Sequence, residues 1–414
     1  MPHPPSPPAV ASRRAVIAMA VSAPQLMALS CSTPARLPAV PSTLTAQAQP
    51  SIPNARFFPE RNDPALVNEV MASFGKERAW LASSGHTGPL PPAAFLTISG
   101  GGGDGAFGAG LLTGWSEAGT RPDFKLVTGI STGALIAPFA FLGSKYDPTL
   151  AETYTNVSDA DIFKKRGPTA ALFSDAMADT TPMAKLLNKY VTRDVLDAVA
   201  AEHAKGRWLL IGTTNLDSRE PVYWNMGAIA TSKDPAALTL FRNVVVASAS
   251  IPGAFPPVMI DVTADGVQYQ EMHVDGGATR QVFMYPQTFR LAEQSAAAGV
   301  ERQRAVYIIR NSRLDPDWAS VDRRMLSIVN RAVSSLIQTQ GFGDLNRMYL
   351  TTQRDHVDYN LAYIPRDFTV KKKSDFDVDY MTPLFERGRQ LGAAGYPWAK
   401  YPPGYDPKDA AETP

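Results

Sequence analysis

Two strand–glycine–helix turns between Phe95 and Gly143 constrain the fold of this chain most strongly. In each, a short apolar strand runs into a glycine-rich turn and then into a helix of small or apolar residues. The first turn reads Ser99-Gly100-Gly101-Gly102-Gly103-Asp104-Gly105, and the second reads Gly129-Ile130-Ser131-Thr132-Gly133. Glycines let neighbouring backbone pass close by, and N–H groups at a helix start stabilise an anion. The first turn is therefore a candidate anion site, and the second presents the Ser131 hydroxyl as a candidate nucleophile.

The rest of the chain from Ala93 onward alternates strands with helices. Several of the strands are continuous apolar runs, which are typical of parallel strands covered on both faces. We therefore predict a layered α/β fold around a mostly parallel central sheet. The expected strands are Ala94–Ile98, Lys125–Thr128, Trp208–Thr214, Pro221–Tyr223, Met272–Val274 and Ala305–Ile309.

A third motif, Val274-Asp275-Gly276-Gly277, ends one of these strands in a carboxylate. Ligand sites in layered α/β folds lie at the carboxyl ends of the strands. Asp104, Ser131 and Asp275 each follow a predicted strand, so we expect them on one edge of the sheet. A carboxylate placed there can accept the proton of a serine hydroxyl, provided that its pKa is raised by burial.

Together the three motifs resemble those of the patatin-like phospholipases, which combine a G-G-G-x-x-G loop, a G-x-S-x-G turn and a D-G-G or D-G-A turn. The runs Gly212–Asp217 and Ala249–Pro257 are similar to the family too, and the resemblance covers about Ala93–Pro286. It implies a three-layer α/β/α patatin-like fold with a Ser–Asp dyad and no catalytic histidine. One departure is Asp104, which stands where many family members carry arginine or lysine.

The resemblance implies roles for individual residues. Ser131 is the nucleophile, Asp275 is the general base, and no metal or cofactor is needed. The backbone N–H groups of Gly101, Gly102 and Gly103 form the oxyanion hole. The remaining motif glycines are Gly100, Gly105, Gly129, Gly133, Gly276 and Gly277.

The resemblance also implies the reaction, which is cleavage of carboxylic esters of phospholipids or lysophospholipids through an acyl-enzyme. A neutral-lipid lipase or a thioesterase with the same dyad remains an alternative. So does a lipid-binding surface protein that keeps the fold without catalysis. A net charge of +1 argues against a nucleic-acid partner, whereas a membrane surface is an expected one. The sequence leaves the oligomeric state open.

Two histidines offer a different mechanism. An α/β-hydrolase triad runs Ser…Asp…His, and His356 follows Asp275 in that order. His356 lies among charged residues without a glycine-rich loop, however, which argues against a catalytic role. His273 precedes Asp275 by two residues on a strand, so both side chains should face the same side. We expect His273 to be a packed histidine rather than a catalytic one.

The N-terminal part of the chain is typical of an exported bacterial protein. Arg13 and Arg14 precede a short apolar run, so residues 1–30 are predicted to be a signal peptide. Cleavage there would leave the chain's single cysteine, Cys31, at the new N-terminus as a lipidation candidate, although a chance cysteine in the leader is an alternative. The expected location is the cell envelope, with Cys31 as the candidate point of lipid attachment, and a soluble periplasmic or secreted protein is the alternative.

The remaining chain divides into three predicted parts. Residues 31–92 form a Pro-rich tether and a leading helix, 93–400 the acyl hydrolase domain, and 401–414 a C-terminal tail. Within the domain, Tyr146–Ala204 is expected to be a helical insertion over the site or ordinary packing helices. Ser320–Thr352 is expected to be helical with a break near Gly341 or Gly343. The basic run Lys371–Lys373 is expected to be solvated, with a membrane-surface contact as the alternative.

Overall fold

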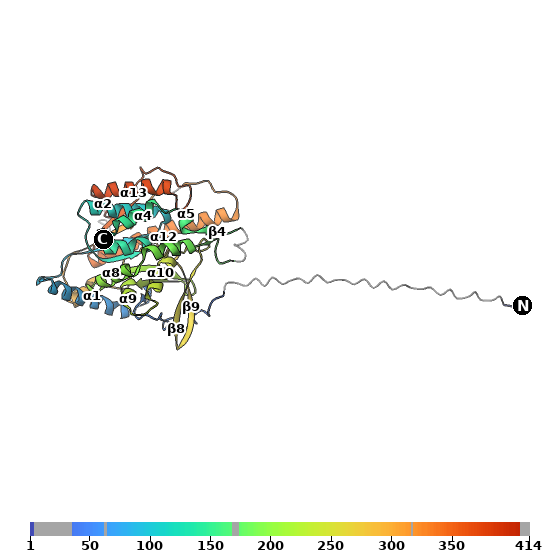
Figure 1. Cartoon of the computed structure of the whole chain (residues 1–414), viewed down its shortest axis with the longest axis horizontal. Coiled ribbons are helices and arrows are strands. Elements are labelled where there is room, and N and C mark those ends of the chain that lie inside the picture. The colour runs from blue at the N-terminus through green and yellow to red at the C-terminus, as the bar shows by residue number, and fades with distance from the viewer. Residues whose placement is uncertain (4–34, 62–63, 168–173, 316–317, 406–414) are drawn as a thin grey trace, which may run out of the picture.

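The computed structural model describes residues 1–3, 35–61, 64–167, 174–315 and 318–405 (Figure 1). Cys31 and most of the predicted signal peptide lie outside these residues.

The described residues contain a central sheet with strand order β1-β7-β6-β3-β2-β10-β11. Strands β6, β3, β2, β10 and β11 run parallel, and β1 and β7 run antiparallel at one edge. The sheet is therefore mostly parallel, as predicted, and all six expected strands are present. The bounds are Arg56–Phe57 for β1, Ala93–Ile98 for β2, Phe124–Gly129 for β3, Trp208–Asn215 for β6, Glu220–Asn225 for β7, Arg304–Arg310 for β10 and Asp358–Tyr363 for β11.

Alternate strand residues face two separate apolar cores. Leu96, Val127 and Leu209 belong to one core, while Phe95 and Leu126 belong to the other. The first core is covered by α2 (Gly105–Glu117), α3 (Thr132–Leu142), α8 (Arg193–Ala204), α10 (Ala237–Ser248) and α13 (Val378–Ala393). The second is covered by α1 (Pro64–Ser83), α11 (Leu291–Ala297) and α12 (Met325–Asp355). The fold is therefore a three-layer α/β/α arrangement, in which strands buried on both faces are apolar throughout.

A hairpin of β8 (Val258–Ala264) and β9 (Val267–Asp275) joins the sheet at the end of β6. Its turn residues Asp265 and Gly266 have φ values of 48° and 76°, as a two-residue hairpin turn requires. Strand β9 runs antiparallel to β6 and pairs with it only over Thr213–Asn215. Asp275 therefore reaches the carboxyl edge of the parallel strands from a strand that runs in the opposite direction.

The segment 35–61, which composition predicts to be part of an extended tether, packs against the domain instead. Strand β1 pairs with β7, and Gln49 forms a bridge with Thr263 in the hairpin. The Arg56 guanidinium forms a buried ion pair with Glu271 of β9. Proline and alanine do not prevent such packing, because an edge strand and single anchoring side chains need no hydrophobic period.

The predicted insertion contains α4 (Asp147–Thr155), α5 (Asp159–Ile162), α7 (Thr181–Tyr190), all of α8, and the small strands β4 (Lys164–Lys165) and β5 (Ala178–Asp179). α9 (Met226–Thr231) packs beside α8 and α10. The expected break near Gly341 or Gly343 is wrong, because α12 is continuous. A side-chain carbon at Gly341 would lie 2.7 Å from an Arg310 guanidinium nitrogen, so this glycine permits a close approach within an intact helix.

Candidate active site

Ser131 occupies a strained turn between β3 and α3. Its φ and ψ are 55° and −124°, values that cost a non-glycine residue about 1–3 kcal/mol. The flanking glycines are required by crowding. A side-chain carbon on Gly129 would lie 2.3 Å from the Gly133 carbonyl oxygen, and one on Gly133 would lie 2.2 Å from that of Ile98. The G-x-S-x-G pattern therefore produces a turn that holds Ser131 at the start of the buried helix α3.

Asp275 is the second member of the site, at the end of β9. Its Oδ1 accepts a hydrogen bond of 2.7 Å from the Gly277 N–H, and only 5% of the residue is exposed. Burial raises the pKa of Asp275 to about 7, although hydrogen bonds with the Ser131 hydroxyl and the Gly277 N–H lower it. The structure thus brings the predicted nucleophile and the predicted base into contact, with a carboxylate that can take up a proton near neutral pH.

The glycine loop that follows β2 lies directly against this pair. A side-chain carbon at Gly100 would be 3.1 Å from the Ser131 Cβ. Among the described residues, the N–H groups of the predicted oxyanion-hole residues Gly101, Gly102 and Gly103 have no acceptor, and the same holds for Thr132 at the start of α3. Gly103 is buried against Asp375 and Met381. Unpaired N–H groups from two helix starts can stabilise a negative charge that develops beside Ser131.

Two residues outside the predicted motifs hold the glycine loop in place. The backbone carbonyl of Gln281 accepts from the Gly100 N–H, and the side-chain Nε2 of Gln281 donates to the Gly277 carbonyl. Gln281 therefore connects the glycine loop with the Asp275 turn. The Asn311 side chain bridges the Ser99 carbonyl and the Gly108 N–H. Neither residue has a sequence signal, because each acts through a contact between distant segments.

Ser248, at the end of α10, is a further residue that the sequence analysis missed. Its hydroxyl accepts from the Ser131 N–H at 3.0 Å and donates to the Gly212 carbonyl at 2.6 Å. Two residues later, the Ser250 carbonyl accepts from the Asp275 N–H at 2.8 Å. The end of α10 therefore holds the backbones of both Ser131 and Asp275. The run Ala249–Pro257 is similar to the family's sequences, but Ser248 lies just before this run and is not part of any motif in the sequence.

Ser248→Ala should destabilise the fold by about 1–3 kcal/mol and lower ester hydrolysis, because it leaves the buried Ser131 N–H unpaired. Ser250→Ala is the matched control, since its hydroxyl bonds only to the Val246 carbonyl in the preceding turn. Thermal unfolding and hydrolysis rates measured on both variants check this. Equal effects in the two variants would contradict a specific role for Ser248.

Asp104, the departure from the family pattern, does not leave the glycine loop without a cation. Its Oδ1 lies 3.1 Å from the Nζ of Lys372, which comes from the basic run that the sequence analysis singled out. Lys372, which is far from Asp104 in the sequence, thus places a positive charge beside the glycine loop.

His273 belongs to a buried network rather than to the Ser131–Asp275 pair. Its Nδ1 lies 2.9 Å from the Thr213 hydroxyl, and its Nε2 lies 3.1 Å from a Glu271 carboxylate oxygen. Burial alone would raise the pKa of Glu271, but its bonds with His273 and Arg56 hold the pKa at about 2. Both ring nitrogens of His273 are therefore engaged, which agrees with the expectation of a packed histidine.

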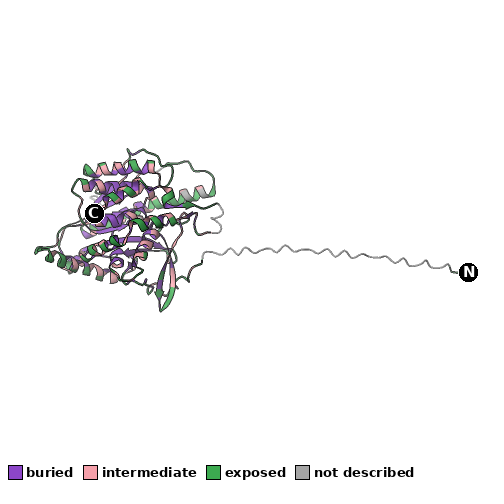
Figure 2. Ribbon diagram, viewed as in Figure 1, coloured by how far each residue is buried: buried purple, intermediate pink, exposed green. Residues whose placement is uncertain are grey.

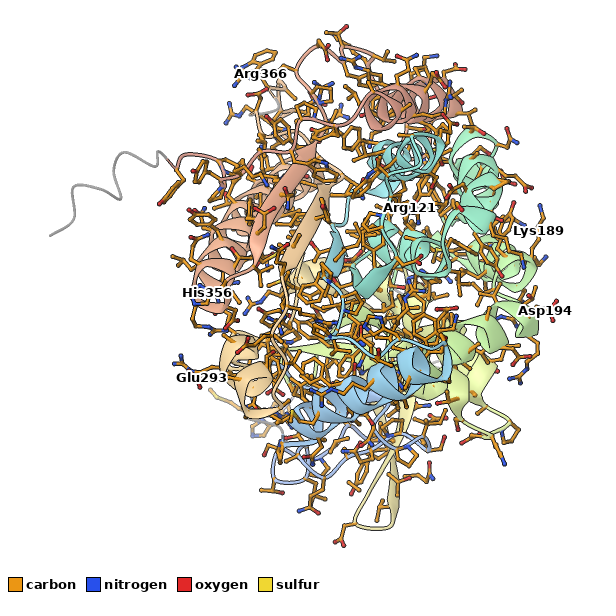
Figure 3. All side chains as sticks on the ribbon, turned by 90° about the vertical axis from the view of Figure 1, so that its left-hand side faces the viewer. Arg121, Lys189, Asp194, Glu293, His356 and Arg366 are labelled. Carbon is orange, nitrogen blue, oxygen red and sulfur yellow. The ribbon has the colours of Figure 1, made fainter. Side chains whose placement is uncertain are left out.

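His356 lies at the opposite edge of the sheet from Ser131. It ends α12 and precedes β11, whereas Ser131 follows β3, and the strands from β3 to β11 are parallel. The residue is exposed, and Figure 3 shows it at the surface. The topology therefore separates His356 from the predicted nucleophile, so the alternative triad is not assembled.

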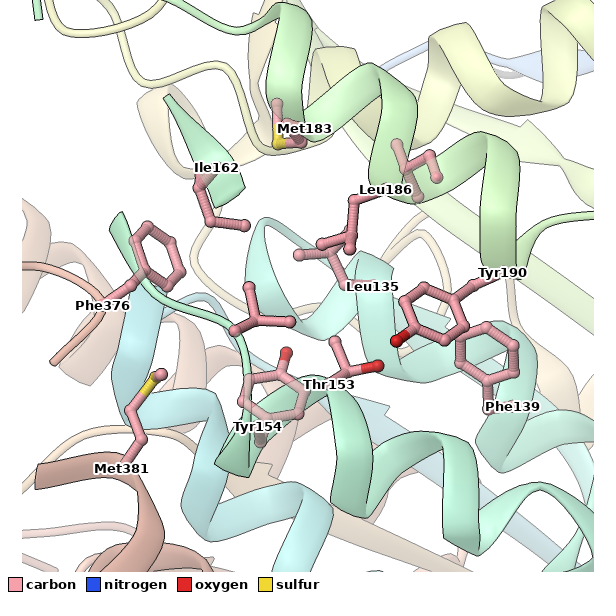
Figure 4. A pocket seen from close by; sticks show the side chains of 12 residues that line it. Leu135, Phe139, Thr153, Tyr154, Ile162, Met183, Leu186, Tyr190, Phe376 and Met381 are labelled. Atoms are coloured by element: carbon pink, nitrogen blue, oxygen red, sulfur yellow. The ribbon is translucent and has the colours of Figure 1, made fainter. Parts of the chain in front are cut away.

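An apolar cavity lies beside the site, among α3, α4, α5, α7 and α13 (Figure 4). Ser131 and Asp275 do not line this cavity, but two of its lining residues contact residues of the site. Tyr154 bonds to Thr132, the residue after Ser131, and Met381 lies against Gly103. The other lining residues include Leu135, Phe139, Ile162, Met183, Leu186 and Phe376. The helices of the predicted insertion thus build an apolar chamber next to the glycine loop.

Among the described residues, no three histidine, cysteine, aspartate or glutamate side chains are placed to hold a metal ion together. Of the helices in the same residues, none combines the length and the apolar character that a bilayer crossing requires.

Residues 96–284 match the sequence model of a family described as patatin-like phospholipase. No curated protein sequence matches the chain. Similar solved structures include VipD from Legionella pneumophila, with 13% identity, 73% of this chain and 67% of that chain covered, and a TM-score of 0.32. Human GIVD cytosolic phospholipase A2 is 10% identical, with 76% of this chain and 56% of that chain covered and a TM-score of 0.29. The type III effector protein ExoU is 13% identical, with 74% of this chain and 54% of that chain covered and a TM-score of 0.25. The chain thus spans little more than half the length of the last two.

Proposed function

We propose that this chain, whose residues 96–284 match the patatin-like phospholipase model, is a lipid acyl hydrolase that cleaves carboxylic esters of phospholipids or lysophospholipids. The observation that supports this best is the contact between Ser131, on its strained turn, and the buried Asp275, whose pKa is about 7. A general base is most effective when its pKa lies near the working pH.

In the proposed reaction the Ser131 Oγ attacks the ester carbonyl carbon while Asp275 takes up the hydroxyl proton. The negative charge on the former carbonyl oxygen is stabilised by the predicted donors, the N–H groups of Gly101, Gly102 and Gly103, together with that of Thr132. The leaving alcohol receives the proton from Asp275, which leaves an acyl group on Ser131. A water molecule, deprotonated by Asp275, then attacks the carbonyl carbon of this acyl-enzyme; the bond to the Ser131 Oγ breaks, Asp275 returns the proton to that Oγ, and the fatty acid is released.

The apolar cavity supports a substrate with a hydrocarbon chain. Its walls contact Thr132 and Gly103, so an acyl chain whose ester carbon lies at Ser131 has an apolar chamber next to it. Burying each methylene group of such a chain contributes about 0.8 kcal/mol. This favours a long-chain acyl ester over a small soluble one, and it fits a neutral-lipid lipase or a thioesterase as well.

A serine-reactive fluorophosphonate should label the protein once, at Ser131, because that hydroxyl is held beside a base and an anion site. Mass spectrometry of the labelled protein identifies the modified residue. Labelling at another serine, or none at all, would contradict the assignment of the nucleophile and would favour a lipid-binding protein without catalysis.

A panel of lipids given to the same purified protein then tests the substrate class. Release of fatty acid from phosphatidylcholine or lysophosphatidylcholine, faster than from triacylglycerol or acyl-thioester, supports the proposal. The reverse order would favour the neutral-lipid or thioester alternative.

A further inference from the structure

The first half of α12 carries an amphipathic pattern that the fold does not use. Apolar residues recur from Met325 to Ile337 at steps of three and four, as on one face of a helix. Trp318, Met325 and Leu336 are 87%, 76% and 69% exposed. Figure 2 shows this half of the helix as exposed over most of its surface. The other exposed apolar residues of the segment are Val321, Ile328, Val329, Val333 and Ile337.

This apolar face is not a continuation of the face that packs on the domain. In the second half of α12 the buried positions begin at Gly341, Asp344 and Leu345. Counting back from them in helical steps reaches Gln338, Ser334, Arg331 and Ser327, which form the polar face. The Gln338 side chain indeed bonds to the Asp315 carbonyl of the domain. In the first half of α12, Ser327, Arg331 and Gln338 of this polar face are thus partly buried, whereas Ser334 and most of the apolar residues are exposed.

The first half of α12 and the two residues before it carry charge of one sign, although Asp315 and Asp322 lie on either side of Trp318 in the sequence. Between Asp322 and Asp344 the chain contains Arg323, Arg324 and Arg331 and no acidic residue. An apolar face flanked by cations, with a tryptophan nearby, is typical of helices that lie in the plane of an anionic membrane surface.

The same surface continues to the candidate active site. Asp315 pairs with Arg366, which begins the loop that carries Lys371–Lys373, and Lys372 pairs with Asp104 in the glycine loop. In the buried second half of α12, Asp344 accepts a 2.7 Å hydrogen bond from the N–H of Gln281, the residue that connects the glycine loop with Asp275. The exposed first half of α12 and the basic loop are thus joined through Asp315, and each is linked to the glycine loop by contacts of its own element.

We propose that the first half of α12, together with Trp318 and the basic loop 366–373, is a lipid-docking surface that holds the site against an anionic bilayer. This rests on the proposed function for its substrate, a lipid ester. A second copy of the chain fits less well, because Arg323 and Arg324 at the start of two such helices would repel each other, whereas anionic lipid attracts them.

The docking surface is tested by co-sedimentation of the full chain with vesicles of phosphatidylglycerol or of phosphatidylcholine. The protein carries Ser131→Ala, so that no lipid is consumed, and Cys31→Ala, so that no lipid anchor contributes. This protein should bind phosphatidylglycerol vesicles more tightly than phosphatidylcholine vesicles. The triple variant Met325→Ser, Val329→Ser and Leu336→Ser should weaken binding about tenfold or more, because three exposed apolar side chains are removed.

Trp80→Ala is the matched control, since Trp80 is also exposed but lies on α1, which Figure 1 shows at the other side of the molecule from the first half of α12. It should bind vesicles like its parent. Tryptophan emission should shift to the blue on binding, and the shift should be lost in Trp318→Phe.

The triple variant with an intact Ser131 separates this proposal from the proposed function. It should hydrolyse a monomeric short-chain ester at the parental rate, because the docking surface does not touch the reacting atoms. Equal vesicle binding by parent and triple variant overturns the docking surface, even if the hydrolase activity stands. So does a parent that fails to bind vesicles and forms a dimer that the triple variant abolishes.

Discussion

Replacing Ser131 with alanine should lower ester hydrolysis by a factor on the order of 10⁴–10⁶ while the fold stays intact. The hydroxyl supplies the atom that becomes acylated, and no neighbouring side chain can take its place. Alanine keeps the β-carbon that packs beside Gly100, so the melting temperature should change little. Fatty-acid release and thermal unfolding, measured on the same preparation, check both parts.

Ser131→Gly provides a control that links the site to its strained backbone. It should be as inactive as the alanine variant, yet more stable than it by about 1 kcal/mol, because glycine adopts a φ of 55° without the cost that a β-carbon adds. An alanine variant that retains hydrolysis would remove Ser131 from the mechanism. A glycine variant no more stable than the alanine one would show that the turn carries little strain.

The parts of this site that could be predicted from sequence are those determined by short-range patterns. The glycines around Ser131 are needed because backbone atoms approach within the same turn or from the adjacent strand. Parallel strands that are buried on both faces consist of continuous apolar residues, so β2, β3, β6 and β10 could be located from the sequence. Strand β11 was not predicted, because Asp358–Tyr363 follows a charged stretch and carries Asn360.

The remaining parts depend on contacts between distant segments. Ser248 supports Ser131 across 117 residues of sequence, and Lys372 reaches Asp104 from the other end of the domain. The sequence placed Asp275 at a strand end, but only the antiparallel pairing of β9 with β6 shows how the residue reaches the edge next to Ser131. The buried ion pair of Arg56 and Glu271, which anchors the N-terminal segment, likewise has no local signal.

Asp275→Asn should cost nearly as much activity as Ser131→Ala, because the amide keeps the shape of the side chain but cannot take up the proton. Residues that act as one unit are not additive, so the double variant should be scarcely worse than either single variant. His356→Ala and His273→Ala should keep most of their activity per folded molecule. A fall of several orders of magnitude in either histidine variant would favour a triad.

The pH dependence of the wild type follows from the pKa of Asp275, which burial raises to about 7. The carboxylate is the active form, so hydrolysis should fall as the pH drops through about 7. A histidine base with an ordinary pKa near 6.5 would give a similar midpoint, so the midpoint alone does not identify the base. The temperature dependence of the midpoint does identify the base. A carboxylic acid ionises with an enthalpy change near zero, whereas the enthalpy change for an imidazolium ion is substantial. The midpoint should therefore barely move between cold and warm assays.

The same pKa makes a prediction for stability. Between the ordinary aspartate pKa of 3.8 and the raised value of about 7, the folded state binds a proton that the unfolded state does not. The contribution of Asp275 to stability is therefore fully present below the lower value and is lost as the pH rises through the higher one. The asparagine side chain of the variant has no charge to bury, so Asp275→Asn should be more stable than the wild type above pH 7, by up to about 4 kcal/mol.

Denaturant unfolding of wild type and Asp275→Asn at pH 5 and pH 8 measures this difference. The stability gain of the variant should be much larger at pH 8 than at pH 5, and it should accompany the loss of activity. Such a trade of stability for activity is expected of a base whose charge is buried beside the nucleophile. An inactive variant with no gain at pH 8 would show that Asp275 is already ionised at low pH, and the raised pKa would then have no part in the mechanism.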